Sequence, residues 1–148
     1  MNYTIRKAAS ADFEAIFFLI KEFAVFQQTA DKVSITLDQM HADKNLFQCF
    51  VATISDGKII GFATFFFAYY SWSGKALNFD DLYVTKPFRK QGIGKMLLDE
   101  VIALAKKEDC KKLRWQVSGW NTNAISFYKK IGSSIDGLIS TAIFIFRH

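Results

Sequence analysis

One segment with two glycines and three cations carries the clearest chemical signal in this sequence. It reads Arg89-Lys90-Gln91-Gly92-Ile93-Gly94-Lys95. Glycines allow backbone N–H groups to approach a ligand closely, and the N-terminus of a following helix adds partial positive charge. With the charges of the three cations, the segment is suited to hold a pyrophosphate. The alternative is an ordinary strand-to-helix connection with a glycine turn.

The spacing of this segment separates three kinds of phosphate loop. A Walker A loop requires Gly where Arg89 stands and Ser or Thr where Met96 stands. The dinucleotide fingerprint requires a third Gly where Leu97 stands. The pattern Arg/Gln-x-x-Gly-x-Gly/Ala is matched fully by Arg89, Gly92 and Gly94. We therefore retain this third pattern.

Hydrophobic periodicity predicts the elements that position the segment. We expect strands over residues 3–7, 47–54, 59–69, 76–84, 113–117 and 143–146, with a turn over 71–75. We expect helices from 10 to about 26, over 36–42, from about 92 to near 109, and from 121 or 122 to 131. Ser10 is the expected cap of the first helix, and Asp56-Gly57 predicts a hairpin. Strands that come first as a meander and then alternate with helices predict an α/β fold with helices on both faces of a mixed sheet.

Composition places the chain among globular domains. It has 148 residues, of which 51% are hydrophobic and 16 are Phe, so we expect one domain over residues 1–148 with a large aromatic core. The N-terminus shows no signal-peptide pattern, and no stretch of about 18 apolar residues is present. We expect a soluble, cytoplasmic protein that does not contact a membrane.

The sulfur and imidazole groups predict no metal site. Cys49 and Cys110 form no CxxC motif, and we expect two buried free thiols. His41 and His148 are the two histidines, and neither belongs to a recognisable motif. Zinc ligation is therefore not expected, because structural zinc sites need four such ligands.

Several segments together resemble one enzyme superfamily. Residues 80–84, the glycine segment, residues 113–121 and residues 123–132 are similar to the GCN5-related N-acetyltransferase (GNAT) superfamily, in its spermidine/spermine and thialysine acetyltransferase branch. Ile5-Arg6-Lys7-Ala8, residues 19–22, and Trp72 with Gly74-Lys75 fit the same branch. The most specific part is the Trp-Asn-x-x-Ala-Ile-x-Phe-Tyr-Lys run over residues 120–129. The resemblance covers essentially the whole chain.

The resemblance implies a fold and a co-substrate. The mixed, mostly antiparallel sheet would open between its fourth and fifth strands, and acetyl-CoA would lie in that wedge. The strand end at 82–84 would pair with the pantetheine arm, the amides of 90–95 would hold the diphosphate, and Asn121 would bond the arm from the far side. The implied acetyl-CoA site comprises Leu82, Tyr83, Val84, Arg89, Lys90, Gln91, Gly92, Ile93, Gly94, Lys95, Asn121, Phe127 and Tyr128.

The implied reaction is direct attack of an amine on the acetyl group in a ternary complex. Tyr128 matches the general acid of the family, and a phenol with a pKa of about 10 stays protonated at neutral pH, as a donor must. Its alternative is a helix aromatic that packs beside Phe127. Asp80 could deprotonate the amine, through a water, or attract a cationic substrate. Its alternative is a solvated carboxylate at a strand end.

The implied acceptor site departs from that of the polyamine enzymes. It comprises Phe26, Gln27, Trp72, Asp80, Asp81, Arg114, Trp115 and Gln116. Phe26-Gln27 stands where Tyr-Glu is expected, Tyr70 stands in place of an acid, and Ser140 and Ala142 replace a Glu and a Trp. With fewer carboxylates the acceptor is expected to be a small primary amine less charged than spermidine, such as an amino acid side chain or an aminoalkyl thioether. The family also implies a homodimer.

Two other functions fit parts of the pattern. A non-catalytic acetyl-CoA-binding regulatory domain would keep Arg89, Gly92 and Gly94 and would not need Tyr128. A nucleic-acid module would use the basic run Lys106, Lys107, Lys111, Lys112 and Arg114. The net charge of +5 permits such binding, but cations near a helix C-terminus are favoured by the helix dipole alone, and no nucleic-acid-binding motif is present. We expect no nucleic acid partner.

Overall fold

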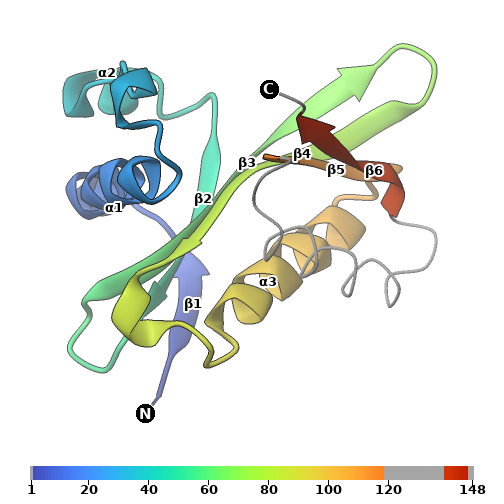
Figure 1. Cartoon of the computed structure of the whole chain (residues 1–148). Helices are drawn as coiled ribbons and strands as arrows, with labels where there is room; N and C mark the ends of the chain where they lie inside the picture. The colour runs from blue at the N-terminus through green and yellow to red at the C-terminus, as the bar shows by residue number, and fades with distance from the viewer. Residues whose placement is uncertain (1, 119–138, 147–148) are drawn as a thin grey trace. The chain divides into compact units, whose positions relative to one another are not determined.

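The computed structural model describes the backbone of residues 2–118 and 139–146 and the side chains of residues 2–114. Its strands form a mixed sheet in the order β1-β2-β3-β4-β5-β6 (Figure 1). The elements are β1 (Thr4–Lys7), η1 (Ser10–Asp12), α1 (Phe13–Phe26), η2 (Ala30–Lys32), α2 (Leu37–Ala42), β2 (Gln48–Thr53), β3 (Ile59–Tyr70), β4 (Gly74–Val84), η3 (Lys86–Phe88), α3 (Ile93–Lys107), β5 (Lys112–Ser118) and β6 (Ile139–Phe146). The predicted mixed α/β sheet is confirmed.

The chain divides into two compact units. The first contains Met1–Thr64 and Asp81–Val101, and the second contains Phe65–Asp80 and Ile102–His148. The long strands β3 and β4 and the helix α3 each contribute to both. That residues 1–148 form a single domain stays a prediction.

Helix α1 packs against the core on one face of the first unit. Its buried residues Phe13, Ile16 and Leu19 recur at helical spacing and lie on one side of the helix. They pack with Met40, Cys49, Val51, Phe62 and Tyr83, which come from α2, β2, β3 and β4. The predicted aromatic core is thus formed between one helix face and the alternating inward residues of the sheet.

The start of α1 differs from the expectation for Ser10. Ser10 begins the 3-10 turn η1, and Asp12 is the residue directly before α1. The Asp12 carboxylate accepts a hydrogen bond of 2.7 Å from the Ala9 amide and forms an ion pair of 2.7 Å with Arg6. The prediction of a Ser10 cap was therefore wrong, because the chain first forms η1 over Ser10–Asp12 and α1 begins only at Phe13.

The first turns of α3 cover the opposite face of the same unit (Figure 1). Ile93, Leu97 and Val101 are buried, as their spacing predicted. Gly61 in β3 is where this face is tightest. A Cβ atom placed there would lie 2.9 Å from the Tyr83 carbonyl oxygen and 3.5 Å from Leu97 Cδ1. A glycine within a strand indicates such a close approach.

In the second unit β4 pairs with β5 in parallel. The pairing joins Ala76 with Lys112 and ends with Phe79 and Trp115. Within the described residues it runs no further, although β5 continues to Ser118 and pairs there with β6. This register agrees with the predicted opening between the fourth and fifth strands. The β5–β6 pair is also parallel, and β6 begins four residues before the expected start.

Turns, cysteines and helix lengths bear on the remaining expectations. The predicted Asp56-Gly57 hairpin is confirmed, with Gly57 at a φ of 88° and the Lys58 amide donating to Asp56 Oδ1 at 2.9 Å. The turn predicted over 71–75 is shorter, because β4 begins at Gly74. Both cysteines are buried and free. The helices of the described chain include none with the length and apolarity needed to cross a membrane.

Candidate functional site

The glycine segment forms the predicted connection between strand β4 and helix α3. Lys90 has a φ of 65° and Gly92 a φ of 81°. Lys90 is therefore held in the left-handed region, which non-glycine residues rarely adopt and which often marks a functional loop. The first hydrogen bond of the helix runs from the Met96 amide to the Gly92 carbonyl at 3.0 Å. The amides before Met96 thus belong to the helix N-terminus, where intrahelical partners are lacking.

The side chains of the segment point in different directions. Ile93 is buried and anchors the start of α3, whereas Lys90 and Lys95 are exposed. The Lys95 ammonium pairs with Asp99 at 2.8 Å on the helix surface, and the Tyr3 hydroxyl donates to Gln91 Oε1. Two exposed cations beside a helix N-terminus form an anion-attracting surface.

Arg89, the first residue of the motif, turns its side chain back toward strand β4 and helix α1. Its Nε donates to the Val84 carbonyl at 2.8 Å. Its guanidinium lies 4.6 Å from the centroid of the Phe26 ring and 5.3 Å from that of the Tyr83 ring. The strand end expected to hold the pantetheine arm is thereby linked to the first loop residue and to the end of α1.

A carboxylate on α1 completes this polar cluster. Glu22 Oε2 accepts hydrogen bonds from the Tyr83 hydroxyl at 2.5 Å and from Thr85 Oγ1 at 2.8 Å. The Tyr83 ring stacks on Phe23 with a centroid distance of 4.8 Å. Burial, followed by the hydrogen bond to Glu22 and its negative charge, raises the pKa of Tyr83 to about 12. Tyr83 is therefore a protonated donor throughout the physiological pH range.

Residues expected at the acceptor site are divided between the two units. In the first, Phe26 is 46% exposed, Gln27 caps the end of α1, and the Asp81 amide donates to Thr64 Oγ1 at 3.1 Å. In the second, Trp72 is 100% exposed, and Asp80 is exposed near the end of β4.

A polar contact accompanies Arg114 in the second unit. Its guanidinium lies 4.8 Å from the centroid of the Tyr70 ring, and the Tyr70 hydroxyl accepts a hydrogen bond of 3.1 Å from Asn78. Trp115 and Gln116 continue strand β5 beside it. Tyr70, which stands where an acid was expected, thus supports a cation in this structure.

The predicted residues Asn121, Phe127 and Tyr128 lie outside the described residues, as does the helix expected from 121 or 122 to 131. Their roles remain predictions that rest on the resemblance. Among the described residues, no group of three or more His, Cys, Asp or Glu side chains could hold a metal ion.

The residues present suit a diphosphate at the start of α3. Gly92 has an open environment, with no heavy atom within 4 Å of a Cβ atom placed there, so its backbone is approachable and glycine is required by φ alone. Amides at the helix N-terminus and the Lys90 and Lys95 ammonium groups supply the donors and positive charge that such an anion needs.

Comparison with known proteins decides the family. The model of the Acetyltransferase (GNAT) family matches residues 4–132. The chain belongs to this family. It is 31% identical over 140 residues to the thialysine N-epsilon-acetyltransferase of Bos taurus, covering 87% of this chain and 82% of the relative. It is 33% identical over 141 residues to the spermidine/spermine N(1)-acetyltransferase-like protein 1 of Homo sapiens, covering 88% of this chain and 20% of the relative.

Solved structures agree on the fold of this GNAT chain. A probable acetyltransferase has a TM-score of 0.77 at 18% identity, over 87% of this chain and 88% of that one. An aminoglycoside acetyltransferase from an uncultured soil metagenomic sample has a TM-score of 0.74 at 22% identity, over 98% and 97%. The expected GNAT fold is confirmed, as is the prediction of an acetyl-CoA-dependent N-acetyltransferase.

Three residues of this acetyltransferase had no predicted role, namely Glu22, Thr85 and Gly61. Glu22 accepts hydrogen bonds from Tyr83 and Thr85, and Gly61 lies against the Tyr83 carbonyl. A signal for Glu22 was available, because it lies three residues after Leu19 and four before Phe26 and so shares the apolar face of the helix. Gly61 carried the signal of a glycine inside an apolar strand.

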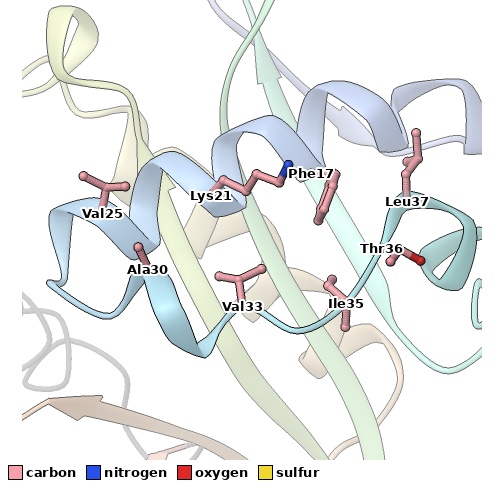
Figure 2. Close-up of a pocket in the computed structure, with 8 residues that line it drawn as sticks. All are labelled: Phe17, Lys21, Val25, Ala30, Val33, Ile35, Thr36 and Leu37. Atoms are coloured by element: carbon pink, nitrogen blue, oxygen red, sulfur yellow. The ribbon is translucent and has the colours of Figure 1, made fainter.

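A groove on the other side of α1 is separate from the loop. It has a volume of about 500 Å³. Figure 2 shows its lining, which is Phe17, Lys21, Val25, Ala30, Val33, Ile35, Thr36 and Leu37. The Lys21 ammonium lies 4.4 Å from the centroid of the Phe17 ring. No residue predicted for acetyl-CoA or the acceptor lines this groove, and its cation would repel an ammonium substrate.

Proposed function

We propose that this acetyltransferase transfers the acetyl group of acetyl-CoA directly to a small primary amine within a ternary complex. The observation that carries the proposal is the start of α3, where Lys90 and Gly92 adopt positive φ directly before the helix N-terminus, an arrangement suited to bind an anion. The thialysine enzyme of Bos taurus and the L-ornithine N5-acetyltransferase of Arabidopsis thaliana, 31% identical over 115 residues, support an amine carried on an amino acid side chain. The latter match covers 77% of this chain and 48% of the relative.

The proposed chemistry needs no covalent enzyme intermediate. The neutral amine attacks the acetyl carbonyl, the C–S bond breaks, the departing sulfur takes a proton, and the nitrogen of the new amide releases one, so that the protons balance. We assign Tyr128 as the general acid that protonates the sulfur. We assign Asp80 as the group that deprotonates or attracts the amine. The assignment of Tyr128 rests on its match to the family motif, and that of Asp80 on its exposed place near the end of β4. A positioned acid contributes about 10²–10⁴-fold to the rate.

An amine panel tests the reaction. Thialysine, ornithine, lysine, spermidine and a histone-like peptide would be offered with acetyl-CoA, and release of free thiol would be followed. We expect the amino acid acceptors to exceed spermidine in kcat/KM. Double-reciprocal plots that intersect support a ternary complex, and parallel lines would contradict it. We expect Tyr128→Phe to lower kcat while the dissociation constant of acetyl-CoA stays unchanged, whereas a non-catalytic domain would show no turnover to lose.

The loop itself is tested by Gly92→Ala. An alanine at a φ of 81° costs about 1–2 kcal/mol, so the loop should leave this conformation and acetyl-CoA affinity should fall by roughly tenfold. Gly57→Ala is the matched control, because Gly57 also has a positive φ and open surroundings but lies in the β2–β3 turn. Calorimetric titration showing equal affinities for the two variants would contradict the loop assignment.

A further inference from the structure

The Arg89 side chain is held by contacts to strand β4 and helix α1. Its Nε is bonded to the Val84 carbonyl, and its guanidinium lies over the Phe26 and Tyr83 rings. Arginine is well suited to such combined fork and stacking contacts. Lys90 and Lys95, by contrast, are exposed cations of the same segment, and the ion pair of Lys95 with Asp99 lies on the helix surface. The two classes of cation therefore differ in what they can offer a diphosphate.

The partner of this arrangement is Glu22. One oxygen of its carboxylate accepts from both Tyr83 and Thr85, which end strand β4 and begin the connection to the loop. Hydrogen bonds to an ionised acceptor are about twice as strong as neutral ones. Tyr83 thus contacts both charges, because its hydroxyl donates to Glu22 and its ring centroid lies 5.3 Å from the Arg89 guanidinium.

We infer that Glu22, Phe26, Tyr83, Thr85 and Arg89 form a positioning device, here termed the Glu22 clamp. The clamp fixes the first residue of the glycine loop and the end of β4 to the last turns of α1. Arg89 thus contributes to acetyl-CoA binding by holding the backbone of the loop in place. Lys90 and Lys95 supply the positive charge for the diphosphate. The inference rests on the proposed acetyl-CoA site and adds the role of Glu22 within it.

The clamp also links the expected acetyl-CoA site to the expected acceptor site. Phe26, which Arg89 contacts, is followed by Gln27 at the end of α1, where the acceptor is expected. A change in the position of α1 is therefore transmitted to the loop through one cation–aromatic contact. We expect variants of the clamp to change both the acceptor KM and the acetyl-CoA affinity. A variant that loses only a contact to the diphosphate should change the acetyl-CoA affinity alone.

Binding of two acetyl donors distinguishes a positioning role of Arg89 from direct binding of the diphosphate. Acetyl-CoA and S-acetylpantetheine share the thioester and the pantetheine arm, but only acetyl-CoA carries the diphosphate. Their dissociation constants would be measured by calorimetric or NMR titration. We expect Arg89→Lys to weaken both by a similar factor of roughly ten, since the positive charge is kept while the fork and the stacking are lost. Lys90→Gln, the matched variant, should weaken acetyl-CoA alone.

Glu22→Gln and Phe26→Leu extend the test to the other side of the clamp. Phe26 is partly exposed, so its replacement should fold even where Arg89→Lys does not. We expect a parallel loss for both donors of roughly threefold or more in each variant. Measurements well below the unfolding temperature exclude a general loss of stability as the cause, because the folded protein then dominates in every variant.

The outcomes separate the inference from the function on which it rests. A loss for acetyl-CoA with no change for S-acetylpantetheine in Arg89→Lys would identify Arg89 as a diphosphate ligand and overturn the clamp. Unchanged affinities in both Glu22→Gln and Phe26→Leu would overturn it as well. A wild-type protein that binds neither donor would overturn the acetyl-CoA site itself, and the clamp with it.

Discussion

Adjacent residues of helix α1 occupy contrasting surroundings. Glu22 faces strand β4, where two hydroxyl groups donate to its carboxylate. Lys21 is exposed and lies over the Phe17 ring at the groove on the other side of the helix. The Glu22 carboxylate is thus fixed by hydrogen bonds within the protein, whereas the neighbouring Lys21 ammonium is largely solvated.

The contrast shows which charged groups are coupled to the site. A half-buried carboxylate with two donors is costly to leave unpaired, so its neighbours are held in place. An exposed ammonium over an aromatic ring gains only about 0.5–1 kcal/mol. Changes near Glu22 should therefore reach the loop, and changes near Lys21 should not.

The largest effect is expected beneath the cluster, at Gly61. Gly61→Ala places a methyl group 2.9 Å from the Tyr83 carbonyl oxygen, so β3, β4 or α3 must shift. Overpacking of this kind costs about 1–3 kcal/mol in the free energy of unfolding. Urea unfolding measures this loss of stability. A variant as stable as wild type would show that the end of β4 can shift without cost.

Matched glutamine substitutions test the contrast directly. We expect Glu22→Gln to lower the free energy of unfolding by about 1–2 kcal/mol, because charged hydrogen bonds become neutral ones. Lys21→Gln should change it by no more than about 0.5–1 kcal/mol. Equal losses in urea unfolding would remove the distinction between the two sides of the helix.

The titration of Tyr83 gives a pH-dependent version of the same test. Its pKa is raised to about 12 from the usual 10, mainly by burial and then by Glu22. Between these pH values the unfolded chain has released the proton and the folded chain keeps it, so stability present below pH 10 is lost as the pH rises toward 12.

Replacement by phenylalanine isolates this contribution. Tyr83→Phe should flatten the loss of stability between pH 10 and 12, whereas Tyr69→Phe, at an 81% exposed position, should leave it unchanged. Urea unfolding at several alkaline pH values, with tyrosinate absorbance followed in parallel, provides the measurement. An identical alkaline loss in wild type and Tyr83→Phe would show that Tyr83 does not cause this pH dependence.

The smallest expected effect concerns Cys49, in the core that α1 covers. Burial raises the pKa of its thiol to about 12, so the reactive thiolate is scarce in the folded protein. All proteins compared would carry Cys110→Ser, so that a disulfide reagent at pH 8 modifies Cys49 alone. This modification should be slow with no further change and with Lys21→Gln. Glu22→Gln should accelerate it a few-fold, because opening of the core costs less. Equal rates in all three would indicate that opening does not involve this face of α1.

Much of the fold followed from local patterns. The spacing of Phe13 and Ile16 predicted α1, Asp56-Gly57 predicted the β2–β3 hairpin, and Ile93 with Leu97 predicted the buried face of α3. These predictions succeeded because helical and strand periods depend on residues near one another in the chain. Ser10 failed as a cap because it lies inside the 3-10 turn η1, and α1 begins only at Phe13.

By itself, the sequence determined the glycine motif, the helix that follows it and the resemblance to the GNAT family, since each depends on residue types at fixed spacing. Only the tertiary structure decided that Arg89 turns toward Val84 and that Glu22 receives Tyr83 and Thr85. It also placed Gly61 beneath the end of β4. The physical reason is that a side chain takes the direction in which its hydrogen bonds and ring contacts are satisfied, and those partners come from strands and helices far away in the chain.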